Sequence, residues 1–364
     1  MHSRDSGHFN GSASPDCRSH VHSRSFLRLL HRLQIPVASG ALMKEPRLHH
    51  YIPRFYLSGF ADPGALRREK KEIIWVYERE KQVRRSAPAK EARQRDFYAF
   101  VKNDSRNVEV ETWLGKVEEQ VAPIIASLAK DKRRITDAEK EGLALFVGTM
   151  QMRTPTGRYL SEMRIDPFVT NVMKEAAADP AKFRSFVEEN YQLPAEDVGF
   201  DLEEVRRDIL AGRGEEIAER DDVKLASIIE VGKRVAQVLF DMNWQTIYSE
   251  NQELFLTSDD PVISHVTNKE TGREHFRMGV DSLGANVWFP LCCNLCLRIN
   301  KDCESGYGRW VNAGIRMVNK MEIMCADRWV FSPERSDKIK DLFDRQGGKL
   351  SIKTVDLRFE GQRY

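Results

Sequence analysis

The spacing of apolar residues changes twice along this chain of 364 residues, and this change constrains the fold more than any other feature. Between Val110 and Leu239, apolar side chains recur every three or four residues, which places them on one face of a helix. On both sides of this region, short runs such as Ile73–Tyr77 and Trp244–Ser249 have the length and alternation typical of strands. The pattern predicts an α+β fold, with a mixed or antiparallel β-sheet core and a central helical insertion at about residues 108–242.

The helical region contains one clear start signal. Thr136-Asp137-Ala138-Glu139 has the Ser/Thr-x-x-Glu form, in which the hydroxyl and the carboxylate each satisfy a free amide at the beginning of a helix. The apolar pattern predicts helices near residues 108–129, 136–150, 158–178, 180–191, 202–211 and 225–239. After Asn243 we expect strands at 244–249, 254–257, 287–291, 295–299, 321–331 and 350–356, with helices at 309–319 and 333–346.

The first 42 residues differ in composition from the rest of the chain. They hold five of the nine histidines, and five arginines against two aspartates. A transit peptide can have this composition, but Met43 directly precedes the first motif of ordered appearance. We therefore expect residues 1–42 to be a disordered extension or the result of a mis-assigned start. Residues 43–364 should then form a single α+β domain, since no low-complexity linker interrupts them.

Hydropathy, cysteine content and charge limit the partners and the cellular location that we expect for this protein. No apolar run approaches the roughly 18 to 20 residues that cross a bilayer, so we expect no membrane partner. Six cysteines in so long a chain, without a normal secretory signal, favour a reducing, cytoplasmic location. Positive charge gathers in Arg67–Arg95, with eleven basic and five acidic residues, and negative charge in Asp179–Asp222, with fourteen acidic and six basic residues. The first region could follow a nucleic-acid backbone and the second could engage a protein partner, although such charge runs are more often solvated faces.

The most distinctive motif is His49-His50-x-x-Pro53-x-x-Tyr56-Leu57-x-x-Phe60. Adjacent residues of a strand point to opposite faces, so that at most one of the two histidines easily faces a given pocket. A neutral imidazole can act as a general base or bind a metal, which makes His49 and His50 candidate catalytic residues. The alternative is a buried histidine that is hydrogen-bonded to the main chain.

A second motif, Thr257-Ser258-Asp259-x-Pro261, follows an apolar segment. Asp259 lies just beyond the expected strand end, a position where functional sites are often built, and its carboxylate could act in catalysis or bind a metal. Asp and Ser before Pro also form turns by accepting hydrogen bonds from nearby amides. Both interpretations of Asp259 stay open at this point.

Three further polar residues are candidates for a site. Arg153 continues the apolar stripe of its helix, so that its charge needs an anionic partner, which could be a carboxylate such as Glu118 on the preceding helix, a helix C-terminus or a ligand phosphate. Asn319 can bind a substrate or hold main-chain groups, and Tyr56 is a further candidate for substrate binding. His265 and His275 lie in a polar stretch, where we expect them to be exposed in loops.

These motifs resemble a bacterial family of domains of unknown function, DUF4238. The resemblance rests on the opening histidine motif, the strand Ile74–Tyr77, Arg153, the Thr-Ser-Asp-x-Pro element and Asn319, and it covers about residues 46–331. It implies a cytosolic bacterial protein, and some members of the family occur among genes associated with defence against phage. It implies no reaction, because the family has no assigned catalytic residues.

Two hypotheses follow for the function. The first is a metal-dependent phosphodiesterase or nuclease, in which His49 or His50 is the base, Asp259 and Glu118 hold a divalent cation, and Arg153, Asn319 and Tyr56 bind the substrate. The alternative is a non-catalytic sensor or protein-interaction module, in which the same residues stabilise the fold. The sequence lacks the signatures of P-loop, Rossmann, α/β-hydrolase and zinc-protease sites, which disfavours those classes.

Overall fold

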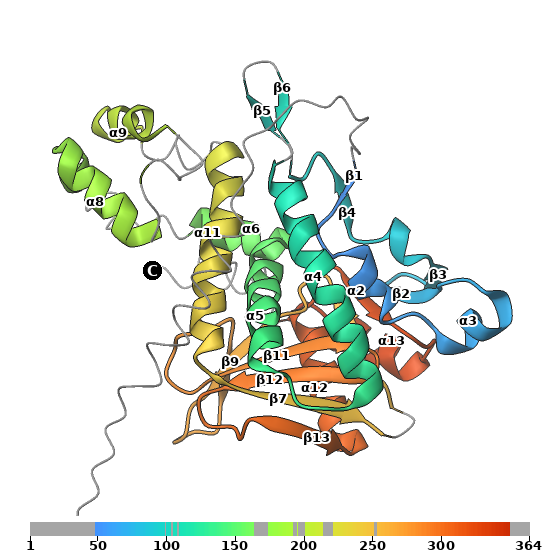
Figure 1. The fold of residues 1–364 in the computed structure, drawn as a ribbon. Helices are drawn as coiled ribbons and strands as arrows, with labels where there is room; N and C mark the ends of the chain where they lie inside the picture. Colours follow the sequence, from blue (N-terminus) through green and yellow to red (C-terminus); the bar gives the residue numbers. More distant parts are fainter. Residues whose placement is uncertain are drawn as a thin grey trace, which may run out of the picture. The chain divides into compact units, whose positions relative to one another are not determined.

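In the part of the chain that the computed structural model describes, a six-stranded sheet, a four-stranded sheet and two short strand pairs are combined with a group of helices (Figure 1). The structure describes residues 48–98, 100–102, 105–107, 109–163, 174–191, 195, 201–213, 221–250 and 253–349. All of them belong to one compact unit, Ile35–Tyr364. The helices and the mixed sheet confirm the predicted α+β class.

The larger sheet has six strands in the order β10-β9-β11-β12-β7-β13. Its neighbours are antiparallel, except that β13 runs parallel to β7. Buried residues fill β7, β11 and β12, which makes these central strands the core of the sheet. The strands are β7 (Asn243–Ser249), β9 (Ile263–Thr267), β10 (Glu274–Phe276), β11 (Ala285–Cys292), β12 (Leu295–Asn300) and β13 (Gly306–Trp310).

The smaller sheet joins the beginning of the described chain to its end. Its order is β3-β2-β14-β8, and every neighbouring pair is antiparallel. The strands are β2 (Ile74–Glu78), β3 (Arg84–Ser86), β8 (Thr257–Ser258) and β14 (Trp329–Ser332). Two short antiparallel pairs lie outside both sheets, β1 (Leu48–His50) with β4 (Arg93–Arg95), and β5 (Phe100–Lys102) with β6 (Ser105–Asn107).

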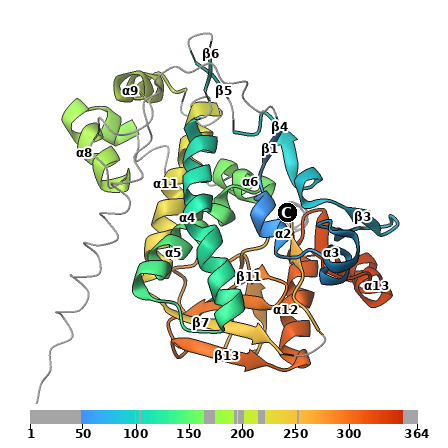
Figure 2. The ribbon, with the colours of Figure 1, turned by 45° about the vertical axis from the view of Figure 1, so that its right-hand side comes forward.

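The predicted helical insertion lies between β6 and β7. It contains α4 (Glu109–Asp131), α5 (Asp137–Met152), α6 (Pro155–Met163), α8 (Pro180–Tyr191), α9 (Leu202–Leu210) and α11 (Asp221–Phe240). The predicted capping box is confirmed, because Thr136 and Glu139 exchange the two expected hydrogen bonds at the start of α5. In both views α4, α5 and α11 stand together over the six-stranded sheet (Figures 1 and 2). None of the helices in the described ranges combines the length and apolar character that a membrane crossing requires.

Two glycines let α5 and α11 approach closely. A Cβ atom on Gly148 would lie 2.2 Å from the carbonyl oxygen of Gly232, and one on Gly232 would lie 3.1 Å from the Thr149 side chain. A side chain at position 148 would therefore collide with the main chain of α11, whereas one at position 232 would be a tight contact that requires Thr149 to shift by a few tenths of an ångström. The close packing agrees with the almost complete burial of α5 between Gly142 and Met150.

The structure corrects two predictions in the last third of the chain. Residues 321–331 do not form one strand: α12 (Asn312–Cys325) continues to Cys325, and only β14 is extended. The segment is apolar on several sides, so its spacing cannot distinguish a buried helix from a buried strand. His265 is not in an exposed loop but is 6% exposed on β9, where its Nε2 accepts the indole N–H of Trp288 at 3.0 Å. The strand predicted at 350–356 lies outside the described residues.

Candidate functional site

The opening motif forms a strand, a turn and a short helix. β1 pairs with β4, Pro53 fixes the backbone ahead of α2 (Arg54–Ser58), and Tyr51 donates its N–H to the Ala92 carbonyl at 3.0 Å. As expected for neighbours on a strand, the two histidines have different surroundings. His49 is fully buried, whereas His50 is half-buried.

His49 uses both ring nitrogens in contacts within the protein. Its Nδ1 accepts the Tyr98 N–H at 2.9 Å, and its Nε2 lies 3.0 Å from Glu111 Oε2. An amide can only donate, so the proton of the neutral ring is on Nε2, facing the carboxylate. The ring also stacks on Tyr98 with centroids 5.9 Å apart. These contacts connect β1 to α4 and hold the imidazole in one orientation.

Arg153 caps the C-terminus of α5 and is 3% exposed. Its guanidinium donates to Glu118 Oε1 at 2.6 Å, to the His50 carbonyl at 2.8 Å and to the Tyr98 hydroxyl at 3.1 Å. The ion pair with Glu118 is the one that the helical spacing predicted as the alternative to a ligand phosphate. Arg153 therefore joins α4, α5 and the histidine strand, and one oxygen of Glu118 is occupied by this contact.

Asp259 accepts three main-chain hydrogen bonds, from Asp327 at 2.8 Å, Arg328 at 2.8 Å and Trp329 at 3.1 Å. It is 3% exposed, and burial, together with the nearby charge of Asp327, raises its pKa to about 7, while the three amides act in the opposite direction. Because both carboxylate oxygens are engaged, Asp259 fixes the segment between α12 and β14. Asp259 lies just beyond β8, as expected, but the amides that it accepts belong to a segment distant in the sequence and not to a local turn. Within the motif, Ser258 accepts the nearby amide of Asp260 at 3.3 Å.

The two motifs meet directly at Tyr56. Its hydroxyl lies 2.8 Å from Thr257 Oγ1 and donates to the Pro290 carbonyl at 2.7 Å. Its ring stacks on Phe289 with centroids 5.3 Å apart. Burial raises the pKa of Tyr56 well above its usual value, so the phenol stays protonated. Tyr56 thus connects α2, β8 and β11 in the core.

Two buried carboxyl groups that the sequence did not mark as site residues, Asp260 and Glu322, lie beside the second motif. Ser258 donates to Glu322 Oε2 at 2.6 Å, and Asp260 pairs with Arg277, which also donates to the Cys325 carbonyl at 2.5 Å. Glu322 is fully buried, and burial raises its pKa well above the usual value. The sequence contains one signal that could have identified Glu322, because this carboxylate stands alone inside the apolar run 321–325.

The structure does not bring all the predicted site residues into contact. His50, Glu118 and Arg153 form one connected group, whereas Asp259 binds the main chain at 327–329. Asn319 holds the main chain on both sides of Phe255, donating to Leu254 at 2.9 Å and accepting from Leu256 at 3.1 Å. Nothing in these contacts favours a cation shared by Asp259 and Glu118. Among the side chains that the structure describes, no three His, Cys, Asp or Glu residues are arranged to hold a metal ion.

Comparison with known proteins shows the family to which the chain belongs. A family model described as a protein of unknown function, DUF4238, matches residues 48–336, which is most of the chain. The chain belongs to the DUF4238 family. No curated protein and no solved structure matches it.

This DUF4238 member carries a strongly basic region around the opening motif. Between residues 51 and 98 there are twelve lysines and arginines, all exposed, and seven carboxylates. The basic region consists of Arg54, Arg67, Arg68, Lys70, Lys71, Arg79, Lys81, Arg84, Arg85, Lys90, Arg93 and Arg95. These residues lie on α2, α3 (Pro63–Glu69), the β2–β3 hairpin, η2 (Pro88–Lys90), β4 and the adjoining turns, which are side by side in both views (Figures 1 and 2).

His50 lies at one edge of the basic region. Burial lowers its pKa, and the charges of Arg93, Arg153 and Arg54 lower it further, while a hydrogen bond to the main chain of Glu91 raises it. The Nδ1 atom of His50 is buried and makes no hydrogen bond within the described part of the chain. His50 is therefore a neutral imidazole surrounded by arginines, an arrangement that favours a bound anion.

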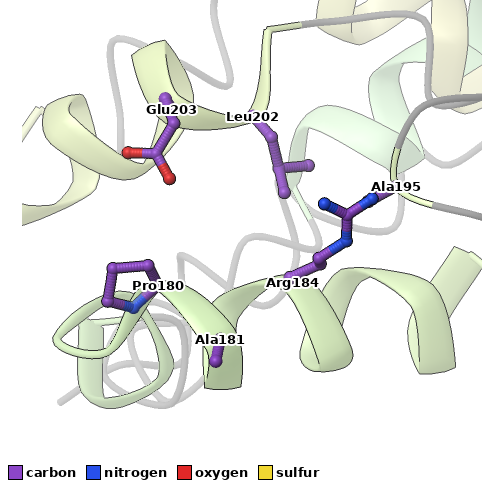
Figure 3. Close-up of a pocket in the computed structure, with 6 residues that line it drawn as sticks. All are labelled: Pro180, Ala181, Arg184, Ala195, Leu202 and Glu203. Atoms are coloured by element: carbon purple, nitrogen blue, oxygen red, sulfur yellow. The ribbon is translucent and has the colours of Figure 1, made fainter.

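A separate hollow of about 420 Å³ lies between α8 and α9 (Figure 3). The facing sides of α8 and α9 pack through a small apolar cluster that includes Phe183 and Ile209. The charged residues at the hollow pair on their own helices, Arg184 with Glu188 and Glu203 with Arg206. The hollow is lined by Pro180, Ala181, Arg184, Ala195, Leu202 and Glu203, none of which belongs to the predicted site.

Proposed function

We propose that the protein binds the phosphate backbone of a nucleic acid through its basic region. The observation that carries this proposal is the excess of five positive charges over residues 51–98, with every lysine and arginine of the segment exposed. A surface with this charge attracts a polyanion and releases the ions condensed on it. The proposal makes the non-catalytic sensor hypothesis specific, with nucleic acid as the partner.

The pairing of charges within the region supports the proposal. Glu91 is bound by Arg84 through two short hydrogen bonds of 2.6 and 2.7 Å, and Lys81 and Arg328 both donate to Glu78. No carboxylate of the described residues lies within ion-pair distance of Lys70, Lys71, Lys90 or Arg93. These cations are therefore available for phosphate groups.

His50, Arg54 and Arg93 are the central contacts in this proposal. Arg54 is exposed, with a long 3.7 Å contact to Glu72, and Arg93 lies on β4 opposite His50 in the register of the strand pair. The half-buried imidazole of His50 lies beside the two arginines, whereas the lysines of the basic region are exposed to solvent. A phosphate held by the two arginines would also favour the protonated form of His50.

Hydrolysis does not enter the proposal. The nuclease hypothesis needs Asp259, Glu118 and a histidine at one phosphate, but in the structure each of these groups contacts a different partner within the protein. Nuclease activity with magnesium or manganese, and a role in defence against phage, stay predictions. Degradation of labelled DNA or RNA by the wild-type protein but not by Asp259→Ala would support the nuclease hypothesis.

A binding titration tests the proposal. We expect fluorescence anisotropy of a labelled oligonucleotide to show binding that weakens steeply with salt, by a log–log slope of about 0.9 per phosphate contact on a duplex and about 0.7 on a single strand. The double variant Arg54→Gln/Arg93→Gln should bind more weakly and lower the slope by about one to two. A matched control is Arg184→Gln on α8, outside the basic region, which should bind as the wild type does. Absence of salt-dependent binding by the wild type would overturn the proposal.

A further inference from the structure

An arginine stacked on a tryptophan lies where strand β14 begins, in the four-stranded sheet. The guanidinium of Arg328 lies over the Trp329 ring, 4.4 Å from its centroid, and the Arg328 side chain is 54% exposed. Trp329 itself is half-buried. The pair presents a planar, positively charged group to solvent.

The stack is held from two sides. Arg328 Nε donates to Glu78 Oε1 at 2.8 Å, and Asp259 accepts the main-chain N–H groups of Arg328 and Trp329. Although partial burial acts in the opposite direction, hydrogen bonds from Lys81 and Arg328 lower the pKa of Glu78 to about 2. Glu78 is therefore ionised at neutral pH, and the orientation of the guanidinium plane is fixed before any ligand arrives.

The stack adjoins the basic region. Directly opposed residues of an antiparallel sheet share a face, and so do residues two apart on a strand. Trp329 is opposite Glu78, and Arg84 is opposite Val76, so that Trp329 and Arg84 are on the same face. Lys81, which shares Glu78 with Arg328, belongs to the basic region.

We infer that the Arg328–Trp329 stack receives an unpaired base, and that the ligand of the basic region is single-stranded nucleic acid. The inference rests on the proposed function. Bases of a duplex already stack on their neighbours within the helix, whereas an unpaired base offers a free π-face to an aromatic ring or a guanidinium plane. The phosphates of the same strand would lie along the exposed arginines and lysines, and the base would extend the stack on Arg328.

The chain offers a matched control for this stack. Arg85 lies over Trp75 at 5.7 Å and pairs with Glu69, but Trp75 is on the opposite face of the sheet from Trp329. Lysine keeps the charge of arginine and loses the planar group that stacks. The variants Arg328→Lys and Arg85→Lys therefore make the same chemical change on the two faces.

The test is a comparison of single-stranded and duplex oligonucleotides of the same length, titrated at one salt concentration. We expect the wild type to prefer the single strand, Arg328→Lys to bind the single strand about tenfold more weakly, and its duplex affinity to stay unchanged. Arg85 belongs to the basic region, and lysine keeps its charge, so any change in affinity caused by Arg85→Lys should be the same for the single strand and the duplex. A circular dichroism spectrum matching the wild type shows that each variant is folded.

Two results would overturn the inference without affecting the proposed function. One is equal affinity of the wild type for single strand and duplex, with both still dependent on Arg54 and Arg93. The other is an equal loss of both affinities in Arg328→Lys, which would make Arg328 another phosphate contact. Failure of the wild type to bind either oligonucleotide would overturn the inference together with the proposed function.

Discussion

The guanidinium of Arg153 is bound by groups from three parts of the chain, Glu118 on α4, the hydroxyl of Tyr98 and the His50 carbonyl. A charge in the interior costs several kcal/mol unless a partner compensates for it. Here the compensation is complete within the protein. The hydrogen bond from Arg153 to the His50 carbonyl also fixes the main chain of the histidine motif beside the basic region.

Replacement of Arg153 tests this structural role. We expect Arg153→Ala to lower the free energy of unfolding by about 3–5 kcal/mol, since Glu118 and two further acceptors lose a buried partner. Urea unfolding followed by circular dichroism measures the change. The control Arg184→Ala removes an exposed pair with Glu188 and should cost less than about 1 kcal/mol. An Arg153→Ala protein as stable as the wild type would instead favour the prediction that Arg153 binds substrate.

At the scale of elements, the sequence predicts the structure correctly where one periodicity dominates. The capping box at Thr136 and the stripe of α4 are observed as predicted. The failures occurred where tertiary packing decides the structure. α12 is apolar around much of its circumference, and β13 begins with Gly306 and Gly308, which are unfavourable in a strand interior.

The crossing of α5 and α11 gives a prediction that compares two glycines of one helix. Gly148→Ala should destabilise the protein by roughly 1–3 kcal/mol, because the new methyl group would lie 2.2 Å from a main-chain oxygen of α11. Gly142→Ala should stabilise it by about 0.5–1 kcal/mol, because the added methyl meets only ordinary contacts at 3.7 Å and alanine favours the helix. Thermal or urea unfolding measures both, and an equal effect of the two changes would contradict the observed packing.

At the scale of the whole molecule, strands from the two ends of the described chain form one sheet, with the helical insertion between them. Asp259, Arg153 and Asn319 are polar residues within apolar stretches of the sequence. This position correctly predicts that each needs a hydrogen-bond partner in the folded protein. Their partners are mainly main-chain groups of segments far away in the sequence, such as residues 327–329 for Asp259 and 254–256 for Asn319. Side-chain spacing carries no information on such partners. The candidate residues could therefore be listed from the sequence, but among the contacts described for Arg153, Asp259 and Asn319 only the Arg153–Glu118 pair was predicted.

The buried carboxyl of Glu322 makes the stability of the whole molecule depend on pH. Burial raises its pKa, although the Ser258 hydrogen bond and the charge of Arg277 act in the opposite direction, and burial also raises the pKa of Asp259 to about 7. A carboxyl whose pKa is higher in the folded state stabilises the protein fully below its unfolded pKa. This stabilisation is lost as the pH rises through the folded pKa, so we expect the free energy of unfolding to fall from mildly acidic to alkaline pH.

The variant Glu322→Gln isolates this contribution, because its amide resembles the protonated acid and can still accept the Ser258 hydroxyl. We expect the variant to be close to the wild type in stability at acidic pH and more stable than the wild type at alkaline pH, with a smaller overall dependence on pH. Asp259 should still cause part of the loss near neutrality. Urea unfolding across this pH range measures the difference. A variant that is less stable by the same amount at every pH would mean that Glu322 is ionised throughout and is stabilised by Arg277, since an ion pair with a permanently charged partner loses the same energy at each pH.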